Sequence, residues 1–438
     1  MTRGPITPQI FHFTMPLIIG NFFVLSYNVA DSIIVGRYIG ANALAALGAA
    51  SPVMNIILFL IIGICLGMSV LMGIFFGEGD ITKLKRVVST SLIAGGFFTV
   101  ILVILGFLFS RNILQIMYTP AGILDDATSY LQIIFVGLIF TFIYNIYAST
   151  LRSMGNSRVS LYFLIVSALL NVAMDFLFVV EWKQGVTGAA FATVIAEALA
   201  ALFCIIYVRI KFPFLIFKRG EFVLDKVLLQ TIVSYSSVAA MQQIALHVGK
   251  FLIQGAVNPL GIVVIAAFNI VTRIDDFVMI IQQNIGHGTT GFLAQNTGKG
   301  AVDRIRKGFF VGVKMEAIYT LIVSVIVFFF ASELVSLFKG KGESAVVVAG
   351  IRYLRMMAFL YFLPALTNIL QAYFRGLGKM KITLNATVIQ IIGRVISAYF
   401  IAPYLGIEAF ALACLVGWIC MLSYEVPKFW KSWKKNVV

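Results

Sequence analysis

The sequence predicts an all-α integral membrane protein with 12 transmembrane helices in two pseudo-symmetric six-helix lobes. Three observations predict this fold class. Of the 438 residues, 61% are hydrophobic and only 12% are charged, whereas a soluble domain has about 25% charged residues. Long apolar stretches recur along the whole chain. Short motifs of the first half also return in the second half.

The apolar stretches have the length of helices that cross a bilayer, since such a helix needs roughly 20 apolar residues. Barrel strands would instead alternate between apolar and polar residues in short segments. The first stretch is longer than the core of a signal peptide, and we expect it to be a helix of the protein. The predicted spans are 10–35, 44–75, 87–109, 129–150, 159–180, 187–208, 228–257, 261–293, 308–331, 350–373, 383–402 and 407–427.

Lysine and arginine predict the orientation, because cytoplasmic loops carry an excess of them. One set of alternate connections is strongly basic, and the other set holds few cations, among them Arg37, Arg111 and Lys183. The basic set comprises Arg3, Lys83, Lys85, Arg86, Arg152, Arg158, Arg209, Lys211, Lys218, Arg219, Lys226, Lys299, Arg304, Arg306, Lys307, Arg375, Lys379, Lys381, Lys428, Lys431, Lys434 and Lys435. We therefore expect a multi-pass protein of the cell (inner, cytoplasmic) membrane with both termini in the cytoplasm. The net charge of +15 follows this topology, so we do not expect nucleic-acid binding.

The two halves repeat with a nearly constant step. Gly77-Glu78-Gly79 returns as Gly298-Lys299-Gly300, and Leu151-Arg152-Ser153-Met154-Gly155 returns as Phe374-Arg375-Gly376-Leu377-Gly378. The repeat predicts an N-terminal six-helix lobe at 1–210, a cytoplasmic linker at 211–226 and a C-terminal six-helix lobe at 227–438. Internal repeats of this kind build transporters with the substrate path between the halves.

Enzymatic chemistry finds little support in the sequence. No serine–histidine–acid arrangement, metal cluster or phosphate-binding loop stands out, and the four cysteines lie within apolar runs without the spacing of a metal site. We expect a protein that is not an enzyme and has no cofactor other than a coupling ion.

Asp31 is the first candidate functional residue, because an ionised Asp in the hydrocarbon region costs at least ~2.5–3.5 kcal/mol. Asn171 and Asp175 are four residues apart, which places them on one face of a helix. Thr193 lies in the next predicted helix among small residues that permit close helix contact. Pro16 removes a backbone hydrogen bond and permits a bend in the first helix.

These residues belong to stretches that resemble the MATE (multidrug and toxic compound extrusion) family, in particular its DinF-like branch, of the multidrug/oligosaccharidyl-lipid/polysaccharide exporter superfamily. The resemblance covers essentially the whole chain. The stretches are Pro16 with Tyr27-Asn28-Val29-Ala30-Asp31, Leu151-Arg152-Ser153-Met154-Gly155-Asn156, Leu170-Asn171-Val172-Ala173-Met174-Asp175, Gly185-Val186-Thr187-Gly188-Ala189-Ala190, Ala294-Gln295-Asn296-Thr297-Gly298 and Arg375-Gly376-Leu377-Gly378.

The resemblance implies a secondary active antiporter that exports amphipathic, often cationic, compounds in exchange for H+ or Na+ by alternating access. It also implies that Asp31, Asn171, Asp175 and Thr193 form the cation-binding, coupling site, and that the bend at Pro16 is linked to the carboxylates. Carboxylate, amide and hydroxyl oxygens suit a hard cation such as Na+. Two desolvated carboxylates also favour binding of a proton, so Na+ and H+ both stay open.

The C-terminal half lacks a copy of this oxygen site. The repeat step places Leu252, Arg394, Ala398 and Cys414 at the positions that correspond to Asp31, Asn171, Asp175 and Thr193. The NorM-like branch of the family carries a glutamate in the seventh helix, near Leu246 or His247 here, and an aspartate in the tenth helix, near Asn368 here. Both acids are absent from this sequence.

Polar residues of the C-terminal half nevertheless follow one face of the seventh and eighth helices. We expect Lys250, Arg273 and Arg394 to be matched partly by Asp275 and Asp276, since charges at this depth must pair or face water. The alternative is a cationic pocket for an anionic or zwitterionic substrate group. The candidates for the substrate cavity are Tyr27, Asn28, Tyr144, Gln243, His247, Lys250, Asp276 and Arg394. For Glu197 and for Glu316, which we expect to pair with Lys314, we favour structural roles.

Two rival functions stay open beside the exporter. A flippase or exporter of a lipid-linked saccharide or another anionic amphiphile is favoured by the cations of the C-terminal half. A membrane-embedded enzyme has no paired catalytic motif to support it. The partners that we expect are small amphipathic molecules and the lipid bilayer, and we expect the protein to be a monomer.

Overall fold

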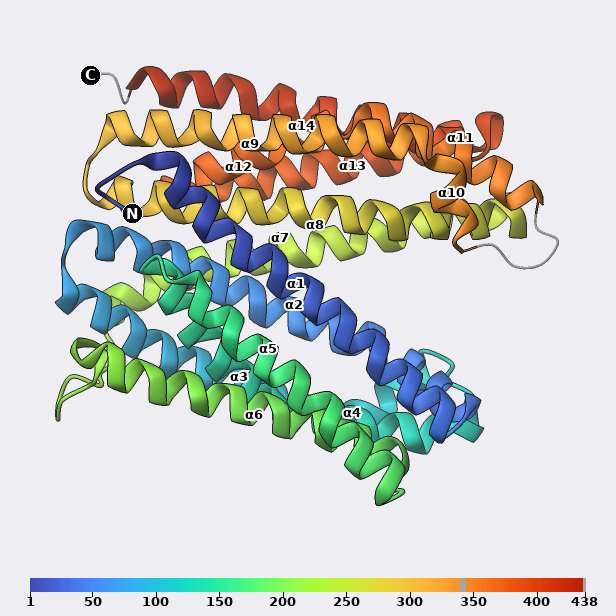
Figure 1. Cartoon of the computed structure of the whole chain (residues 1–438), viewed down its shortest axis with the longest axis horizontal. Helices are drawn as coiled ribbons and strands as arrows, with labels where there is room; N and C mark the ends of the chain where they lie inside the picture. Colours follow the sequence, from blue (N-terminus) through green and yellow to red (C-terminus); the bar gives the residue numbers. More distant parts are fainter. Residues whose placement is uncertain (339–343, 436–438) are drawn as a thin grey trace. The chain divides into compact units, whose positions relative to one another are not determined.

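The computed structural model describes residues 1–338 and 344–435, which are almost entirely helical and contain no β-strand (Figure 1). The side chains of Leu25, Asn28, Ser344 and Lys435 also lie outside the described part. The candidate cavity residue Asn28 therefore has a backbone position in the first helix, but its side chain is not described.

The helices follow the predicted spans, and most of them extend beyond the predicted ends. They are α1 (Ile6–Tyr38), α2 (Ala41–Glu78), α3 (Ile81–Ile116), α4 (Ala121–Ser153), α5 (Ser157–Asp175), η1 (Phe176–Glu181), α6 (Gly185–Lys211), η2 (Pro213–Leu215), α7 (Lys226–Val257), η3 (Asn258–Leu260), α8 (Ile262–Gly298), α9 (Val302–Phe329), α10 (Ala331–Ser336), α11 (Ser344–Leu360), α12 (Phe362–Gly376), α13 (Met380–Leu405) and α14 (Glu408–Lys435).

Residue contacts divide the chain into two compact units. The first unit is Met15–Ala240, and the second is Met1–Thr14 with Met241–Val438. α1 and α7 each contribute residues to both units. The boundary between these units is defined by residue contacts and falls within α7, whereas the predicted lobes were defined by the sequence repeat. The lobe division with a linker at 211–226 therefore stays a prediction.

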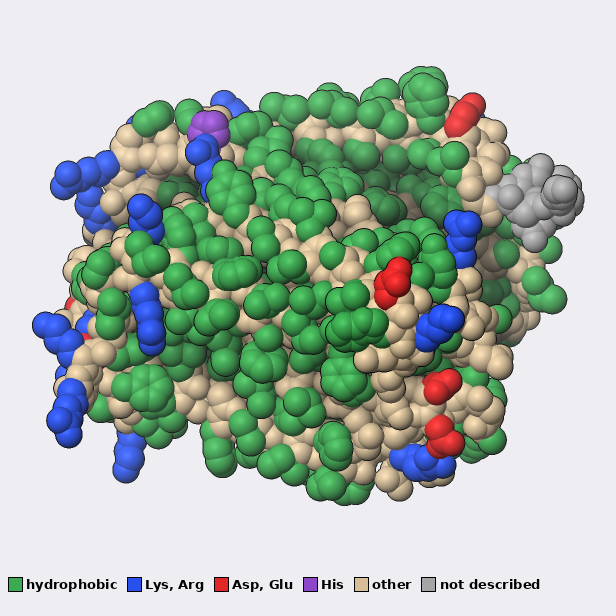
Figure 2. All heavy atoms as spheres, turned by 60° about the horizontal axis from the view of Figure 1, so that its bottom comes forward, with side chains coloured by type: hydrophobic (Ala, Val, Ile, Leu, Met, Phe, Trp, Pro, Cys, Tyr) green, Lys and Arg blue, Asp and Glu red, His purple; other side chains and the backbone are tan. Residues whose placement is uncertain are grey.

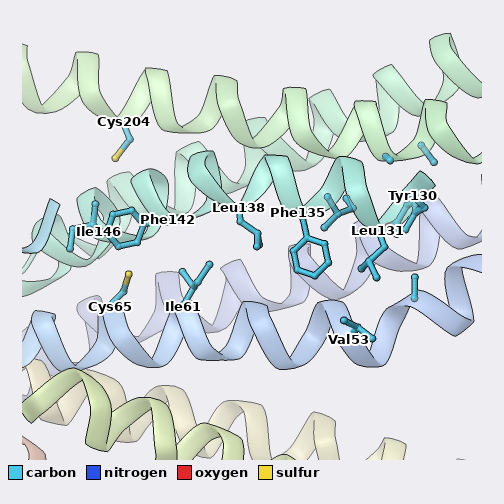
Figure 3. Close-up of a cluster of buried hydrophobic side chains, with 14 of the residues drawn as sticks. Val53, Ile61, Cys65, Tyr130, Leu131, Phe135, Leu138, Phe142, Ile146 and Cys204 are labelled. Atoms are coloured by element: carbon cyan, nitrogen blue, oxygen red, sulfur yellow. The ribbon is translucent and has the colours of Figure 1, made fainter. Parts of the chain in front are cut away.

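The core of the first unit is built around α4, which packs against α2, α3 and α6. Figure 3 shows Leu131, Phe135 and Phe142 of α4 pointing toward Val53 and Ile61 of α2. Large side chains of α4 fit against small residues of α3. A Cβ added to Gly106 would lie 2.3 Å from the Phe135 ring, so the lack of a side chain at Gly106 makes room for this ring. Burial of these apolar groups fixes α4 at the centre of the unit.

α2 carries a G-x-x-x-G pattern, Gly63 to Gly67, that meets the first part of α7. A Cβ on Gly67 would lie 2.6 Å from the main-chain carbonyl carbon of Tyr235, and one on Gly63 would lie 2.7 Å from the Cα of Ala240. Glycine pairs of this spacing permit close approach of helix backbones in membranes. The backbones of α2 and α7 are therefore in direct contact here, and the Ser236 hydroxyl donates to the Ile64 carbonyl at 3.1 Å.

The segment between α6 and α7 is bound to the beginning of α3. The Ser89 hydroxyl donates to the Val223 carbonyl at 2.9 Å and accepts from the Val223 amide at 2.8 Å. Lys85 forms an ion pair with Glu221 and holds the pKa of that exposed carboxyl below its usual value. The Asp225 carboxylate then caps α7, because it accepts from the Leu228 amide at 3.1 Å.

The second unit packs α8 against α9 and α12, and α13 against α14. Its predicted span 350–373 is a broken helix, with α11 and α12 meeting at 44°. Tyr361 lies at the break and is fully buried. Pro364 follows three residues later, where it has no amide hydrogen to donate to the Leu360 carbonyl. The proline accounts for the break.

Among the described residues, nine helices are long and apolar enough to cross a membrane, or ten if the bent pair α11–α12 counts as one span. Most of the predicted spans are therefore supported by their length and hydrophobicity. α7 and α8 are also long enough, with 32 and 37 residues, but they are not among these nine. They contain the polar stripe that includes Lys250, Arg273 and Asp276.

The surface is that of a membrane protein. Hydrophobic side chains cover most of the face in Figure 2, and Lys and Arg gather at its left edge. Phe97 and Phe251 are 70% and 78% exposed, and soluble proteins rarely expose wide apolar areas. Within the first unit, the basic connections α2–α3, α4–α5 and α6–α7 lie at one end (Figure 1). This arrangement is the one that the charge pattern predicted for that unit.

Candidate ion-binding site

The four predicted coupling residues all lie in the first unit. Asp31 is in the second half of α1, Asn171 and Asp175 are on the last turns of α5, and Thr193 is in α6. α5 begins after Asn156, whose side chain accepts from the Val159 amide at 3.4 Å. α5 packs along α6, and this pairing carries the polar face of α5 toward Thr193.

Asn171 and Thr193 are in direct contact. The Asn171 side-chain amide donates to the Thr193 hydroxyl at 3.3 Å, and that hydroxyl donates to the Ala189 carbonyl at 3.2 Å. Asn171 is 3% exposed, and its Oδ1 is buried without a hydrogen-bond partner among the described residues. The amide nitrogen is thus held by α6 while the amide oxygen is available to a ligand.

Asp31 and Asp175 also come together. Their carboxyl groups lie close enough for a hydrogen bond between them when one carries a proton. Asp175 is fully buried, and no donor of the described residues lies within hydrogen-bond distance of either of its oxygens or of Oδ1 of Asp31. Buried charged groups are normally paired or bound to a metal ion, because burial without a partner is costly. Ionised carboxylates at these positions would therefore lack the partners that buried charges normally have.

α5 changes its winding directly after Asp175. Residues Phe176–Glu181 form a π-helix, in which the Trp182 amide donates to the Leu177 carbonyl at 2.9 Å. Single π-helical turns occur often at functional sites. This turn could not be predicted from the sequence, because the pattern of apolar residues is the same before and after it. The turn places Asp175 at the end of regular α-helix geometry.

A third carboxylate of the first unit has a partner of its own. Glu197 of α6 accepts a hydrogen bond from the Thr141 hydroxyl of α4, which supports the structural role that we expect for it. Sequence reasoning missed Tyr130, which is buried within electrostatic range of Asp31, Asp175 and Glu197. The sequence did indicate that one face of α6 is polar, because Thr193 and Glu197 are four residues apart on this helix.

The two contacts offer buried acceptor oxygens from two carboxylates and an amide, and a hydroxyl that is already hydrogen-bonded to Asn171 and Ala189. Such a donor set suits a hard monovalent cation or a proton shared between the carboxylates. In the described part of the chain, no three His, Cys, Asp or Glu side chains gather as a metal-binding group. A structural transition-metal centre therefore has no support there.

The first-unit candidates for the substrate cavity occupy different surroundings. Tyr27 is within electrostatic range of Asp31 and Glu197. Tyr144 is partly buried, and its hydroxyl donates to the Ser160 carbonyl at 3.2 Å. Pro16 is buried within the continuous helix α1, two residues after the contact boundary between the units. The structure thus groups Tyr27 with the carboxylates and gives Tyr144 a hydrogen bond to α5.

The second-unit candidates form two separate groups. The Lys250 ammonium donates to the exposed Asp276 carboxylate at 2.8 Å. Asp275 instead accepts from the Tyr361 hydroxyl at 2.6 Å and lies within electrostatic range of Arg394. Arg273 is exposed and has no ion pair among the described residues. The expected matching of charges is therefore present for Lys250 and Asp276.

Gln243 and His247 lie on α7 and are partly buried. The spacing of Gln243, His247, Lys250 and Gln254 keeps the predicted polar stripe on one side of this helix. Gln254 donates to the Asn258 side chain at 2.8 Å. The stripe continues to the end of α7.

A polytopic α-helical protein that is built of two repeated halves and has a cluster of unpartnered buried oxygens is typical of membrane transporters. The chain is a member of the MatE family, because the family model matches residues 16–177 and again residues 239–400. The two matches cover both halves, in agreement with the internal repeat. Members of this family are transporters, and the expectation that the protein is not an enzyme is confirmed.

Three known proteins illustrate the likeness. The probable multidrug resistance protein YoeA of Bacillus subtilis is 28% identical, over 97% of this chain and 94% of the relative. An FAD transporter of Shewanella oneidensis is 23% identical, over 77% of this chain and 75% of the relative. A solved MOP superfamily transporter from Pyrococcus furiosus, described as having a binding pocket of reverse polarity, superimposes with a TM-score of 0.92 at 21% identity, over 100% of this chain and 98% of that chain.

The structural likeness confirms the fold prediction of two lobes of six helices. The family prediction is confirmed as well. The assignment to the DinF-like branch stays a prediction.

Proposed function

We propose that this MatE-family transporter is a secondary active multidrug efflux antiporter, in which H+ or Na+ binds at Asp31, Asn171, Asp175 and Thr193. The observation that carries the proposal is the group of buried acceptor oxygens without donors on Asp31, Asn171 and Asp175 in the described part of the chain. Multidrug resistance proteins among the relatives, such as YoeA, support export of amphipathic compounds. The transporter acts as a monomer in the cytoplasmic membrane, with both termini on the cytoplasmic side.

The proposed exchange follows from charge. With both carboxylates ionised, the site favours a cationic substrate and disfavours release of it. Binding of H+ or Na+ neutralises the pair and stabilises the state that has lost the substrate. The coupling is reciprocal, because two ligands that favour different states must weaken each other's binding by the same factor. In this proposal, bending of α1 at Pro16 transmits the change along the helix.

Transport in vesicles tests the coupling directly. The purified protein is reconstituted, ethidium is loaded, and Na+ and H+ gradients are imposed separately. We expect efflux driven by one of the gradients. Asp31→Asn and Asp175→Asn should each abolish driven efflux, since either change removes a charge that the ion must neutralise. Asp126→Asn is the matched control, because Asp126 is an exposed carboxylate of the same unit.

Two outcomes would contradict the assignment. Wild-type efflux in both Asp31→Asn and Asp175→Asn would remove these residues from the coupling step. If neither the Na+ gradient nor the H+ gradient drives efflux, the antiport mechanism is wrong. Thermal unfolding in detergent must show that the variants are folded, so that loss of efflux is not loss of protein.

A second candidate function is export of an anionic amphiphile, such as a flavin nucleotide or a lipid-linked saccharide. It is favoured by Lys250 and Arg273, cations that are exposed on the membrane-length helices α7 and α8. The relative that transports FAD supports the same chemistry. Vesicles that move FAD but not ethidium, with FAD transport lost in Arg273→Gln, would favour this function over the first.

A further inference from the structure

The second unit contains a buried carboxylate that the proposed exchange does not use. Glu316 of α9 is 2% exposed, and the side-chain amide of Asn368 in α12 donates to its Oε1 at 2.7 Å. Its other oxygen, Oε2, is buried without a hydrogen-bond partner among the described residues. The expected partner Lys314 is only two residues away, so it points to another side of the helix, and it is exposed. The expected pair of Glu316 with Lys314 is therefore absent from the described structure.

Gln282 of α8 is linked to Glu316 through Asn368. Gln282 is 1% exposed, and its side-chain amide donates to the Thr320 hydroxyl at 3.0 Å and to the Tyr361 carbonyl at 3.1 Å. Its Oε1 is also buried without a partner in the described residues. The Asn368 amide donates to the Gln282 main-chain carbonyl at 2.5 Å as well as to Glu316. Asn368 thus joins two residues that each have a buried acceptor lacking a donor.

No cation balances Glu316 in the described part of the chain. α9 packs against α8, α10, α11 and α12, and the charged groups of these helices have other surroundings. Tyr319, on α9 itself, is the titratable group within electrostatic range of Glu316. The other groups are Asp275 with Tyr361, Asp276 with Lys250, Arg273 and Glu333 exposed, Arg352 with Glu408, Arg355 over the Phe328 ring, and Arg375 with Gln371. His287 is on α8, five residues after Gln282, and has an interaction of its own.

An ionised carboxylate in these surroundings is physically costly. The penalty for burying a single charge is several kcal/mol even after relaxation, and a buried acid without a counter-charge takes up a proton instead. A Na+ ion at this place would need several oxygen ligands, whereas the cluster has two free acceptors. One added hydrogen on Oε2 matches this shortage of donors.

We propose that Glu316 is a proton-binding site of the second unit, which is protonated at neutral pH and held by Asn368 and Gln282. This site is separate from the Asp31–Asp175 pair and does not depend on the function of that pair. Because Asn368 of α12 links Glu316 of α9 to the Gln282 main chain of α8, the proton is bound where three helices of the unit meet. The chain therefore has a buried acid in each unit that can carry a proton.

Infrared difference spectroscopy of the purified protein tests the proposal without any transport assay. At neutral pH, we expect the wild-type spectrum to contain a carbonyl band of a protonated carboxylic acid that Glu316→Gln removes. The matched control is Glu408→Gln. Glu408 is a carboxylate of the same unit, but it forms an ion pair with the Arg352 guanidinium at 3.7 Å. Glu408→Gln should leave the acid band in place.

A second variant keeps the test decisive if Glu316→Gln does not fold. Asn368→Ser removes the hydrogen bond to Oε1, which is the carbonyl oxygen of a protonated Glu316. The acid band should then move to higher frequency, because a carbonyl without a hydrogen bond vibrates faster. An acid band that is unchanged in both variants, with carboxylate bands altered instead, would show that Glu316 is ionised and would overturn the proposal.

Discussion

At the scale of single residues, the candidate ion site is defined by buried oxygens that have no hydrogen-bond donor among the described residues. Asn171 holds Thr193 through its amide nitrogen and leaves its oxygen free. Asp175 is surrounded by protein, yet neither of its oxygens has a donor there. The residue types were predictable from the sequence, because acids in apolar helices stand out. The contact of Asp31 with Asp175 was not, since the two residues are 144 positions apart, from 31 to 175.

Thr193→Val should weaken both the fold and the ion site. Valine has nearly the same shape as threonine but lacks the hydroxyl, so the Asn171 amide loses its acceptor. Leaving a buried donor unsatisfied costs about 1–3 kcal/mol. We expect a lower unfolding temperature in detergent and a higher concentration of coupling ion for half-maximal efflux.

Thr187→Val is the control for this prediction. Thr187 is on the same helix, and its hydroxyl donates to the Gln184 carbonyl at 2.8 Å outside the site. An ion dependence that Thr193→Val leaves unchanged would show that the hydroxyl is no part of the ion site.

At the scale of helices, glycine positions decide which elements touch. Gly63 and Gly67 bring α2 against α7, and Gly106 accommodates the Phe135 ring. The G-x-x-x-G pattern was visible in the sequence, but its partner was not, because such a pattern permits contact with any helix of suitable shape. The π-helix after Asp175 likewise depends on local hydrogen bonds that apolar periodicity does not reveal, whereas the break at Tyr361 follows from Pro364.

Gly67→Ala should destabilise the first unit. The added methyl group would lie 2.6 Å from the backbone of Tyr235, and backbone cannot move aside as a flexible side chain can. Overpacking of this kind costs typically about 1–3 kcal/mol. Thermal unfolding of the purified protein measures the effect.

Gly96→Ala serves as the comparison for this change. Gly96 is in the interior of α3 with nothing within 4 Å of its added Cβ, and alanine is the better helix former. We expect equal or higher stability for Gly96→Ala. Similar unfolding temperatures for the two variants would contradict the close contact of α2 with α7.

At the scale of the whole molecule, charge and repetition organise the chain. The family matches begin at residues 16 and 239, so each half carries one copy of the same helical plan. The copies differ in chemistry. The first unit places the two acids of its candidate ion site on α1 and α5, whereas the second unit places Glu316 on α9 beside the Asn368 amide. The repeat predicted the shared fold, and it places Leu252 rather than an acid at the position that corresponds to Asp31.

The orientation in the membrane is testable by cysteine labelling in intact cells. Thr82 is exposed in the basic α2–α3 region and Asp126 is exposed in the opposite α3–α4 region. A membrane-impermeant maleimide should label Asp126→Cys but not Thr82→Cys, because the basic connections face the cytoplasm. The background is a variant with Cys420→Ser, since the other three cysteines are buried.

The reverse labelling pattern would place the basic connections outside the cell and contradict the predicted topology. Labelling of Thr82→Cys after permeabilisation is the internal control, because it shows that the residue is reactive once the reagent reaches it.

The sequence by itself determined the class of protein, the repeat and the identity of the acids, because these follow from composition and spacing along the chain. Hydrocarbon excludes unpaired charge, so the position of an acid within an apolar stretch is informative on its own. Only the tertiary structure decided which acids have partners. It paired Asp31 with Asp175, provided Glu197 with the Thr141 hydroxyl, and provided Glu316 with an amide in place of the expected lysine. The reason is that a side chain's partner is set by helix packing, which brings together residues far apart in sequence.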